Sequence, residues 1–286
     1  MSVKLIECPR DAMQGIKEWI PTELKIQYIN QLLKVGFDTI DFGSFVSPKA
    51  IPQMKDTAEV LKKLDLTQTH TKLLAIVANK RGASDACYYD EISYLGYPFS
   101  ISETFQLRNT NATIQESLVR VAEIQDLCLK HKKTLVIYIS MAFGNPYGDE
   151  WNSDIAIQWV DKLYKETGVK IVALADTIGC STPENIQYLF NALLPEFPEI
   201  EFGAHLHTTP DKWKEKVEAA YESGCRRFDG AIKGYGGCPM AKEELTGNMP
   251  TEKMIDLFKS KGENLNLDEE ELKTALELAS KVFNRF

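Results

Sequence analysis

Short strand-like runs alternate with amphipathic helical segments along nearly the whole chain. The strand-like runs lie at residues 3–7, 39–42, 72–77, within 91–101, and at 134–140, 170–175, 202–208 and 227–232. The helical segments between them lie at residues 22–35, 57–64, 114–130, 155–166, 183–194 and 211–223. About eight strand–helix repeats are typical of a parallel sheet closed into a barrel. The sequence therefore predicts an α/β protein with a (β/α)8 TIM-barrel fold.

The length suits one such barrel with an appendage, because 286 residues exceed the about 250 of a typical barrel only slightly. We expect residues 1–286 to form a single catalytic domain, with residues 250–286 forming C-terminal helices. An amphipathic segment at 267–286 begins with four acidic residues, which favour a helix N-terminus. Residues 8–15 contain Pro9 and Gly15 and are expected to form a loop after the first strand.

Composition excludes several classes of function. A net charge of −8 argues against nucleic acid or an anionic membrane as a general partner. No run of about 18 apolar residues is long enough to span a bilayer. The N-terminus leads directly into a strand pattern, so we expect no signal or transit peptide. The six cysteines are scattered and favour reduced thiols, which predicts a cytoplasmic protein.

Two histidines stand two residues apart in the seventh strand-like run. Side chains at i and i+2 share one face of a strand, so His205 and His207 present two imidazoles side by side. A satisfied polar pair at a strand end would also explain such a spacing. Other polar residues follow the predicted strands at their carboxyl ends, where barrels carry their chemistry. These are Arg10, Asp11, Asp41 and Asp176, together with Cys238 in a glycine-rich loop after the eighth strand and Asn248 beyond it.

Asp11, His205 and His207 supply a carboxylate and two imidazoles, and Asn248 could add an amide oxygen. This mixture suits a hard or borderline divalent ion. Each feature has a simpler explanation when taken alone. Arg10 and Asp11 could form a surface ion pair, Asp41 and Asp176 could cap helices, and Cys238 could be an inert buried thiol. No role is expected for the remaining histidines and cysteines, which are His70, His131, Cys8, Cys87, Cys128, Cys180 and Cys225.

Six short motifs resemble those of the 3-hydroxy-3-methylglutaryl-CoA lyases. Residues 9–14 (PRDAMQ) are similar to the family's PRDGLQ, and residues 44–54 (SFVSPKAIPQM) to its SFVSPK…PQM. Residues 175–179 (ADTIG) resemble GDTIG, and residues 205–207 (HLH) resemble HCH. Residues 236–239 (GGCP) match the GLGGCP loop, and residues 247–248 match its GN. The related synthases and aldolases of the same barrel superfamily generally lack the SFVSPK and GGCP segments.

The resemblance implies cleavage of an acyl-CoA substrate into acetyl-CoA and acetoacetate. It implies Mg²⁺ or Mn²⁺ held by four ligands, which are Asp11, His205, His207 and Asn248. It also implies catalytic roles for Cys238, Arg10, His205 and Asp41, and substrate contacts from Arg10, Gln14 and Asp176. We further expect a homodimer that binds neither nucleic acid nor membrane, with Lys49 a candidate for contacting the CoA phosphates.

Four departures bear on the substrate. The family has glutamate where Asp41 stands and aspartate where Thr208 stands, and residues 12–13 and 143–148 also differ. The alternatives are a lyase for a longer 3-hydroxy-3-alkylglutaryl-CoA, an aldolase acting on a 2-oxo acid, and a catalytically silent barrel. Arg10, Asp11, the two histidines and Cys238 are all present, which argues against the silent barrel.

Overall fold

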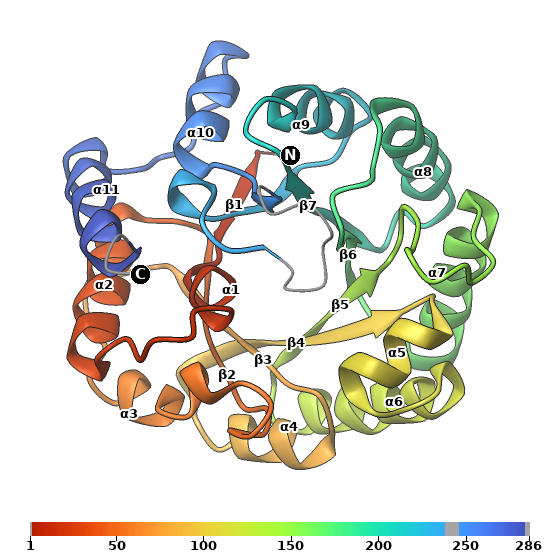
Figure 1. Ribbon diagram of the computed structural model, residues 1–286, viewed down its shortest axis with the longest axis horizontal. Helices are drawn as coiled ribbons and strands as arrows, with labels where there is room; N and C mark the ends of the chain where they lie inside the picture. The colour runs from red at the N-terminus through yellow and green to blue at the C-terminus, as the bar shows by residue number, and fades with distance from the viewer. Residues whose placement is uncertain (1, 238–245, 284–286) are drawn as a thin grey trace.

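Eight strands pair in parallel around a closed ring, with helices outside them (Figure 1). In this computed structural model, which describes residues 2–237 and 246–283, each strand pairs with the next. Lys4 of the first strand pairs with Arg227 of the eighth, which closes the ring. The predicted (β/α)8 barrel is therefore confirmed. The barrel strands are β1 (Lys4–Glu7), β2 (Thr39–Ser44), β3 (Lys72–Ile76), β4 (Ile92–Ser100), β5 (Thr134–Ser140), β6 (Ile171–Asp176), β7 (Glu201–Thr208) and β8 (Arg227–Gly230).

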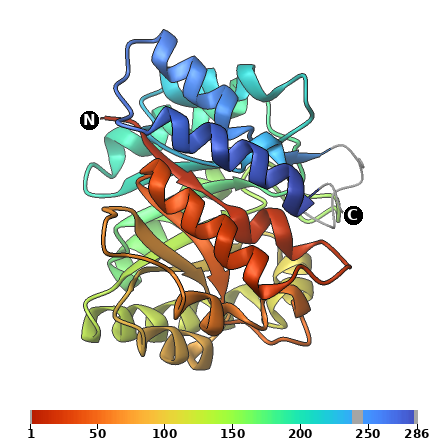
Figure 2. The same cartoon turned by 90° about the vertical axis from the view of Figure 1, so that its left-hand side faces the viewer.

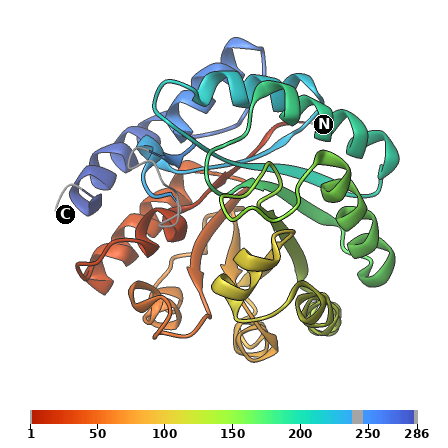
Figure 3. The ribbon, with the colours of Figure 1, turned by 45° about the vertical axis from the view of Figure 1, so that its right-hand side comes forward.

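The helices cover the outer face of the strands, as the tilted view in Figure 3 shows. Among the described residues, no helix has the length and apolar composition needed to cross a bilayer. The helices are α1 (Pro9–Gln14), α2 (Thr22–Val35), α3 (Thr57–Leu61), α4 (Lys80–Cys87), α5 (Glu103–Thr110), α6 (Ile114–Lys130), α7 (Ser153–Thr167), α8 (Pro183–Glu196), α9 (Trp213–Glu222), α10 (Thr251–Ser260) and α11 (Glu269–Phe283), with 3₁₀ turns η1 (Pro52–Met54) and η2 (Ile232–Gly234).

Local signals explain where the best-predicted elements begin and end. The helices at 22–35 and 114–130 and the strand at 134–140 have the predicted bounds. Thr113 and Glu116 form a reciprocal capping box at the start of α6. Gly36 ends α2 in the left-handed conformation with φ of 88°, which glycine adopts without strain. Most other elements differ from the prediction by a few residues at their ends.

Two expectations about local structure are wrong, and the structure adds one strand that the sequence did not predict. Residues 8–15 do not form a loop, because α1 occupies Pro9–Gln14, and proline at the first helical position needs no hydrogen-bond partner. Asp41 does not end the second strand, since β2 runs on to Ser44 through a register shift between Asp41 and Gly43. Residues 247–248 form an additional strand, β9 (Gly247–Asn248), which pairs antiparallel with β7.

The core has two parts, because side chains on each strand alternate between the barrel interior and the helices. The larger part fills the space between strands and helices. The smaller part is made of residues at every second position along their strands. These residues are Leu74, Ile76, Tyr94, Val136, Tyr138, Ile171 and Ala173. A packed interior of this kind leaves the chemistry to the rim at the carboxyl ends of the strands.

The last helix packs along the first long one, and Figure 2 shows α11 and α2 side by side. Gln31 Nε2 donates to the backbone oxygen of Glu271 at 2.9 Å, and the rings of Tyr28 and Phe283 meet edge to face at 5.9 Å. The amphipathic segment expected at 267–286 is therefore helical at Glu269–Phe283, and residues 284–286 lie outside the described part.

Glu7 of β1 forms hydrogen bonds with two segments of the C-terminal part of the chain. Its Oε1 accepts from the backbone N–H of Ile232 at 2.9 Å, and its Oε2 is 2.6 Å from Thr251 Oγ1. Burial raises the pKa of Glu7 from 4.5 to about 8, although these hydrogen bonds act in the opposite direction. Glu7 is therefore protonated in the folded protein at pH 7, whereas an exposed glutamate in the unfolded chain is ionised.

This difference predicts that Glu7 makes the protein less stable as the pH rises from 5 to 7. In that range the folded state binds a proton that the unfolded state does not, so stability falls by about 1.4 kcal/mol per pH unit. Glu7→Gln removes the titration and should remove this share of the pH dependence. Urea unfolding of both proteins at pH 5, 6 and 7 measures it, and parallel pH profiles would refute it.

Candidate metal centre and active site

The paired histidines lie at the carboxyl end of β7, buried and close together. The centroids of the His205 and His207 rings are 5.3 Å apart. Asp11 reaches them from α1, so that one ligand atom from each of the three residues lies within 4.8 Å of the other two. His207 Nε2 is 4.0 Å from Asp11 Oδ2. Residues from opposite ends of the chain thus converge on one point of the rim.

Helix α1 places Arg10, Asp11 and Gln14 as a bonded group. Residues three and four apart lie on one face of a helix. Arg10 Nη1 donates to Gln14 Oε1 at 3.0 Å, and Gln14 Nε2 donates to Asp11 Oδ1 at 2.8 Å. Arg10 Nη1 also donates to Asp11 Oδ1 at 2.9 Å. The ion pair between Arg10 and Asp11 is therefore real, but it is buried and not on the surface.

Asp41 on β2 accepts hydrogen bonds from the other two nitrogens of the Arg10 guanidinium. Arg10 Nε donates to both carboxylate oxygens of Asp41, at 3.2 and 3.0 Å, and Nη2 donates to Oδ2 at 2.5 Å. The bulge that follows Asp41 in β2 is typical of strands beside functional sites. Burial raises the pKa of Asp41 to about 6, with Arg10 acting in the opposite direction. Asp41 does not cap a helix. Its carboxylate fixes the position of the Arg10 side chain.

Strand β9 carries Asn248 to the histidines. It pairs with β7 so that Asn248 stands opposite His207. Asn248 Nδ2 donates to Asp11 Oδ2 at 2.8 Å and to the backbone oxygen of Tyr235 at 2.9 Å. The chain between β8 and β9 passes close to α1 at Gly236, where an added Cβ would lie 2.5 Å from the Cα of Ala12. Only glycine fits at that position.

The charges of these residues suit a bound cation. Although burial alone would raise it, the pKa of Asp11 is lowered to about 2 by Arg10 and the two histidines. Burial and the neighbouring His205 lower the pKa of His207 to about 4. A carboxylate and a neutral imidazole therefore face each other at pH 7. Both ring nitrogens of His207 are buried without a hydrogen-bond partner among the described residues, and a metal ion would bind one of them.

Asp176 ends β6 and belongs to a second buried cluster beside the histidines. Its Oδ2 accepts from the backbone N–H of Ser181 at 3.0 Å and from Lys216 Nζ at 2.8 Å, while its Oδ1 has no partner among the described residues. Lys216 Nζ also donates to the backbone oxygens of Gly179 at 3.0 Å and of His207 at 2.9 Å. Lys216 thus ties the ends of β6 and β7 together from α9.

Two further residues, Asp229 and Lys216, lie at the site although the sequence did not predict them there. Asp229 of β8 lies 3.0 Å from His205 Nδ1, and its place at a strand end was the available signal. Lys216 sits on an ordinary amphipathic helix and gave no signal. Cys8, for which no role is expected, lies close to the site, because its sulfur is within 4.8 Å of ligand atoms of His205 and Asp229. Cys238 lies outside the described residues.

The chain is similar to known proteins over nearly its whole length. The family model described as HMGL-like matches residues 3–279. Hydroxymethylglutaryl-CoA lyase YngG of Bacillus subtilis is 34% identical over 270 residues, which are 93% of this chain and 88% of the relative. The 3-hydroxy-3-isohexenylglutaryl-CoA/hydroxy-methylglutaryl-CoA lyase of Pseudomonas aeruginosa is 33% identical, covering 90% of this chain and 84% of the relative.

A solved structure is similar to this chain over the same range. The HMG-CoA lyase of Acinetobacter baumannii, in complex with coenzyme A and 3-methylmalate, superimposes with a TM-score of 0.90 at 30% identity. The match covers 99% of this chain and 92% of that one. The family model, the curated relatives and the solved structure all name the same family, so this chain belongs to the HMGL-like family of hydroxymethylglutaryl-CoA lyases.

Proposed function

We propose that this protein is a metal-dependent carbon–carbon lyase that cleaves 3-hydroxy-3-methylglutaryl-CoA into acetyl-CoA and acetoacetate. The observation that carries the proposal is the meeting of Asp11, two imidazoles and Asn248 beside the buried Arg10. Family membership supports the reaction class, and the relatives whose names give this activity cover most of the chain.

We propose that the divalent cation is held by Asp11, His205, His207 and Asn248. The unpartnered nitrogens of His207 and the ionised carboxylate of Asp11 support this set. Of Mg²⁺ and Mn²⁺, the two imidazoles favour Mn²⁺, because Mg²⁺ strongly prefers oxygen ligands. Such a cation, when bound, orients the substrate and polarises its oxygens as a Lewis acid.

The cleavage itself is a retro-aldol reaction. The 3-hydroxyl loses its proton, and the bond between C2 and C3 breaks. C3 becomes the ketone carbon of acetoacetate, and the electron pair passes to the thioester enolate. That enolate then takes a proton at carbon to give acetyl-CoA. Arg10 supports this step as a buried, permanently charged donor where the enolate charge develops.

Proton transfer is assigned to Asp41 and Cys238. The pKa of Asp41, raised to about 6 by burial, is close to neutral pH, as suits a group that accepts the hydroxyl proton. A proton-transfer role for His205 competes with cation binding, because its Nδ1 is already bonded to Asp229 and only Nε2 is left. We therefore assign His205 to the cation. The motif of the glycine-rich loop supports Cys238 as the donor to the enolate carbon.

The remaining expectations concern the substrate and the assembly. We propose that Gln14 and the free oxygen of Asp176 contact the acyl group, with coenzyme A as its carrier. The lyase structure with coenzyme A bound supports an acyl-CoA substrate. We also propose a homodimer and a cytoplasmic location. The five free cysteines among the described residues favour a reducing compartment.

Release of acetoacetate from 3-hydroxy-3-methylglutaryl-CoA, with and without EDTA, tests the activity directly. We expect turnover that EDTA abolishes and Mn²⁺ restores. Longer 3-hydroxy-3-alkylglutaryl thioesters and 2-oxo-acid aldols, run beside it, test the alternative substrates. Absence of acetoacetate from the metal-loaded protein would contradict the proposed function.

Asp11→Ala tests the cation site separately from turnover. Removing a charged ligand should weaken Mn²⁺ binding by at least about 100-fold, since loss of a partner that only orients a ligand already costs about 10–100-fold. Titration calorimetry on the metal-free protein measures this. Asp149→Ala is a suitable control, because Asp149 bonds to Ser102 and Thr104 and to none of the proposed ligands. Equal affinities in Asp11→Ala and wild type would place the cation elsewhere.

A further inference from the structure

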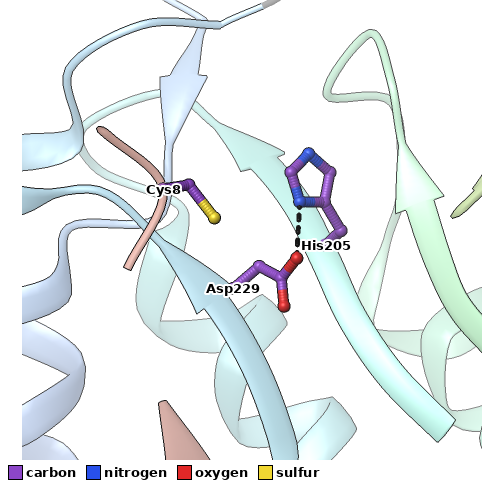
Figure 4. A group of neighbouring side chains, drawn as sticks. All are labelled: Cys8, His205 and Asp229. Carbon is purple, nitrogen blue, oxygen red and sulfur yellow. Dashed lines mark hydrogen bonds and ion pairs between the residues drawn. The ribbon is translucent and has the colours of Figure 1, made fainter. Parts of the chain in front are cut away.

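Asp229 lies beside His205 in the interior of the barrel. Figure 4 shows its carboxylate reaching from β8 toward the imidazole on β7, with the Cys8 thiol nearby. Asp229 Oδ2 is 3.0 Å from His205 Nδ1, and the Asp229 side chain is 1% exposed. Because the Asp229 carboxylate is so deeply buried, water does not replace the imidazole as its hydrogen-bond partner.

This contact determines which nitrogen of His205 carries a proton. An ionised carboxylate only accepts hydrogen bonds, so Nδ1 must be the donor. In the neutral imidazole the lone pair then belongs to Nε2, which lies on the far side of the ring from Asp229 (Figure 4). His207 has no such partner among the described residues, since neither of its ring nitrogens is hydrogen-bonded. The two histidines are thus held differently.

Two neighbours reinforce the contact. Tyr138 on β5 packs edge to face against the His205 ring, with centroids 5.3 Å apart and an interplanar angle of 76°. Arg227, two residues before Asp229 on the same strand, is fully buried, and its Nε and Nη2 have no hydrogen-bond partner among the described residues. Its positive charge on the same face of β8 attracts the negative charge of Asp229. Tyr138 therefore restrains the plane of the His205 ring, and Arg227 stabilises the negative charge of Asp229.

We propose that Asp229 is a positioning residue: its carboxylate accepts the Nδ1 proton of His205, fixes the tautomer and turns Nε2 toward the divalent cation. Histidine ligands whose other nitrogen donates to a carboxylate bind metal more tightly, and loss of that carboxylate typically costs about 10–100-fold in affinity. The inference rests on the proposed cation site, which includes His205.

Metal titration of the folded, metal-free protein tests this without using activity. We expect Asp229→Asn and Asp229→Ala to bind Mn²⁺ about 10–100-fold more weakly than wild type. Glu7→Gln, which removes a buried carboxylate on the neighbouring strand, should leave the affinity unchanged. If wild type itself binds no Mn²⁺, the proposed cation site fails; if wild type and both Asp229 variants bind equally, only the present inference fails.

Cys8→Ser distinguishes a rival arrangement. Cys8, His205 and Asp229 could themselves hold an ion, since their ligand atoms lie within 4.8 Å of one another. In the positioning role, Cys8→Ser keeps the wild-type Mn²⁺ affinity. A loss as large as that in Asp229→Asn would mean that these three residues bind the ion directly, which overturns the proposal.

The tautomer can be read from wild type alone, which keeps the inference testable if Asp229 variants do not fold. In metal-free protein labelled with ¹⁵N-histidine, the nitrogen shifts distinguish a proton on Nδ1 from one on Nε2. The His205 signals can be assigned by their loss in His205→Asn. We expect the proton on Nδ1 in wild type and a mixture of tautomers in Asp229→Ala. A neutral ring that carries its proton on Nε2 and none on Nδ1 in wild type would refute the inference.

Discussion

Replacing Lys216 with methionine should lower the free energy of unfolding by about 3–5 kcal/mol, the usual cost of leaving one partner of a buried ion pair uncompensated. Lys216 Nζ donates to Asp176 Oδ2 and to two backbone oxygens, all at 2.8–3.0 Å. Methionine preserves much of the volume but donates no hydrogen bond. Urea unfolding at pH 7, with both midpoint and slope compared, measures the loss.

Lys165→Met is the matched control. Lys165 pairs with Asp161 on the surface of α7 at 2.7 Å, and its side chain is 69% exposed. Exposed pairs contribute between about 0 and 1 kcal/mol, so this variant should be nearly as stable as wild type. The double variant Lys216→Met/Asp176→Asn should recover part of the lost free energy of unfolding, because it also removes the unpaired negative charge of Asp176. A loss below 1 kcal/mol in Lys216→Met would show that water replaces the ammonium group.

Arg10→Met should slow cleavage by about 10²–10³-fold, or about 3–4 kcal/mol of barrier, if its guanidinium stabilises the enolate as one oxyanion-hole donor does. The arginine is buried against Asp11 and Asp41, so its charge is poorly screened by water. The effect should fall mainly on kcat, because the enolate charge exists only after the carbon–carbon bond begins to break. Steady-state kinetics on the Mn²⁺-loaded enzyme measures it.

Two variants isolate the electrostatic effect. Arg10→Lys keeps a positive charge but cannot make the forked contact with Asp41, so it should recover only part of the rate. Arg81→Met removes an exposed guanidinium on α4 and should leave the rate at the wild-type value. A rate for Arg10→Met within twofold of wild type would exclude Arg10 from charge stabilisation.

Much of this site follows from the chain's periodic pattern. The carboxyl ends of parallel strands meet at one rim, so polar residues that follow separate strands must approach one another. That reasoning placed Asp11, Asp41 and the two histidines near each other, and the structure brings them together. Alternation along β7 likewise put both imidazoles on one face.

Other features depend on tertiary contacts, which the local sequence pattern signals weakly or not at all. Asp229 points inward from β8, whose sequence is typical of a barrel strand. Its role follows only from its contact with His205. Lys216 reaches the rim from an outer helix, so strand ends gave no hint of it. Pro9 and Gly15 predict a loop at residues 8–15, yet these two residues also suit the two ends of a short helix, α1.

The pairing of β1 with β8 has a consequence for how the protein is made. Arg10 and Asp11 precede the imidazoles and Asn248 by most of the barrel in the sequence, so they leave the ribosome well before them. An incomplete nascent chain therefore lacks part of the proposed set of cation ligands, and an ion would bind tightly at that site only once the barrel is complete. Ligands that bind only the native state stabilise it by mass action, so a cation at the proposed site would stabilise the completed barrel and not the incomplete chain.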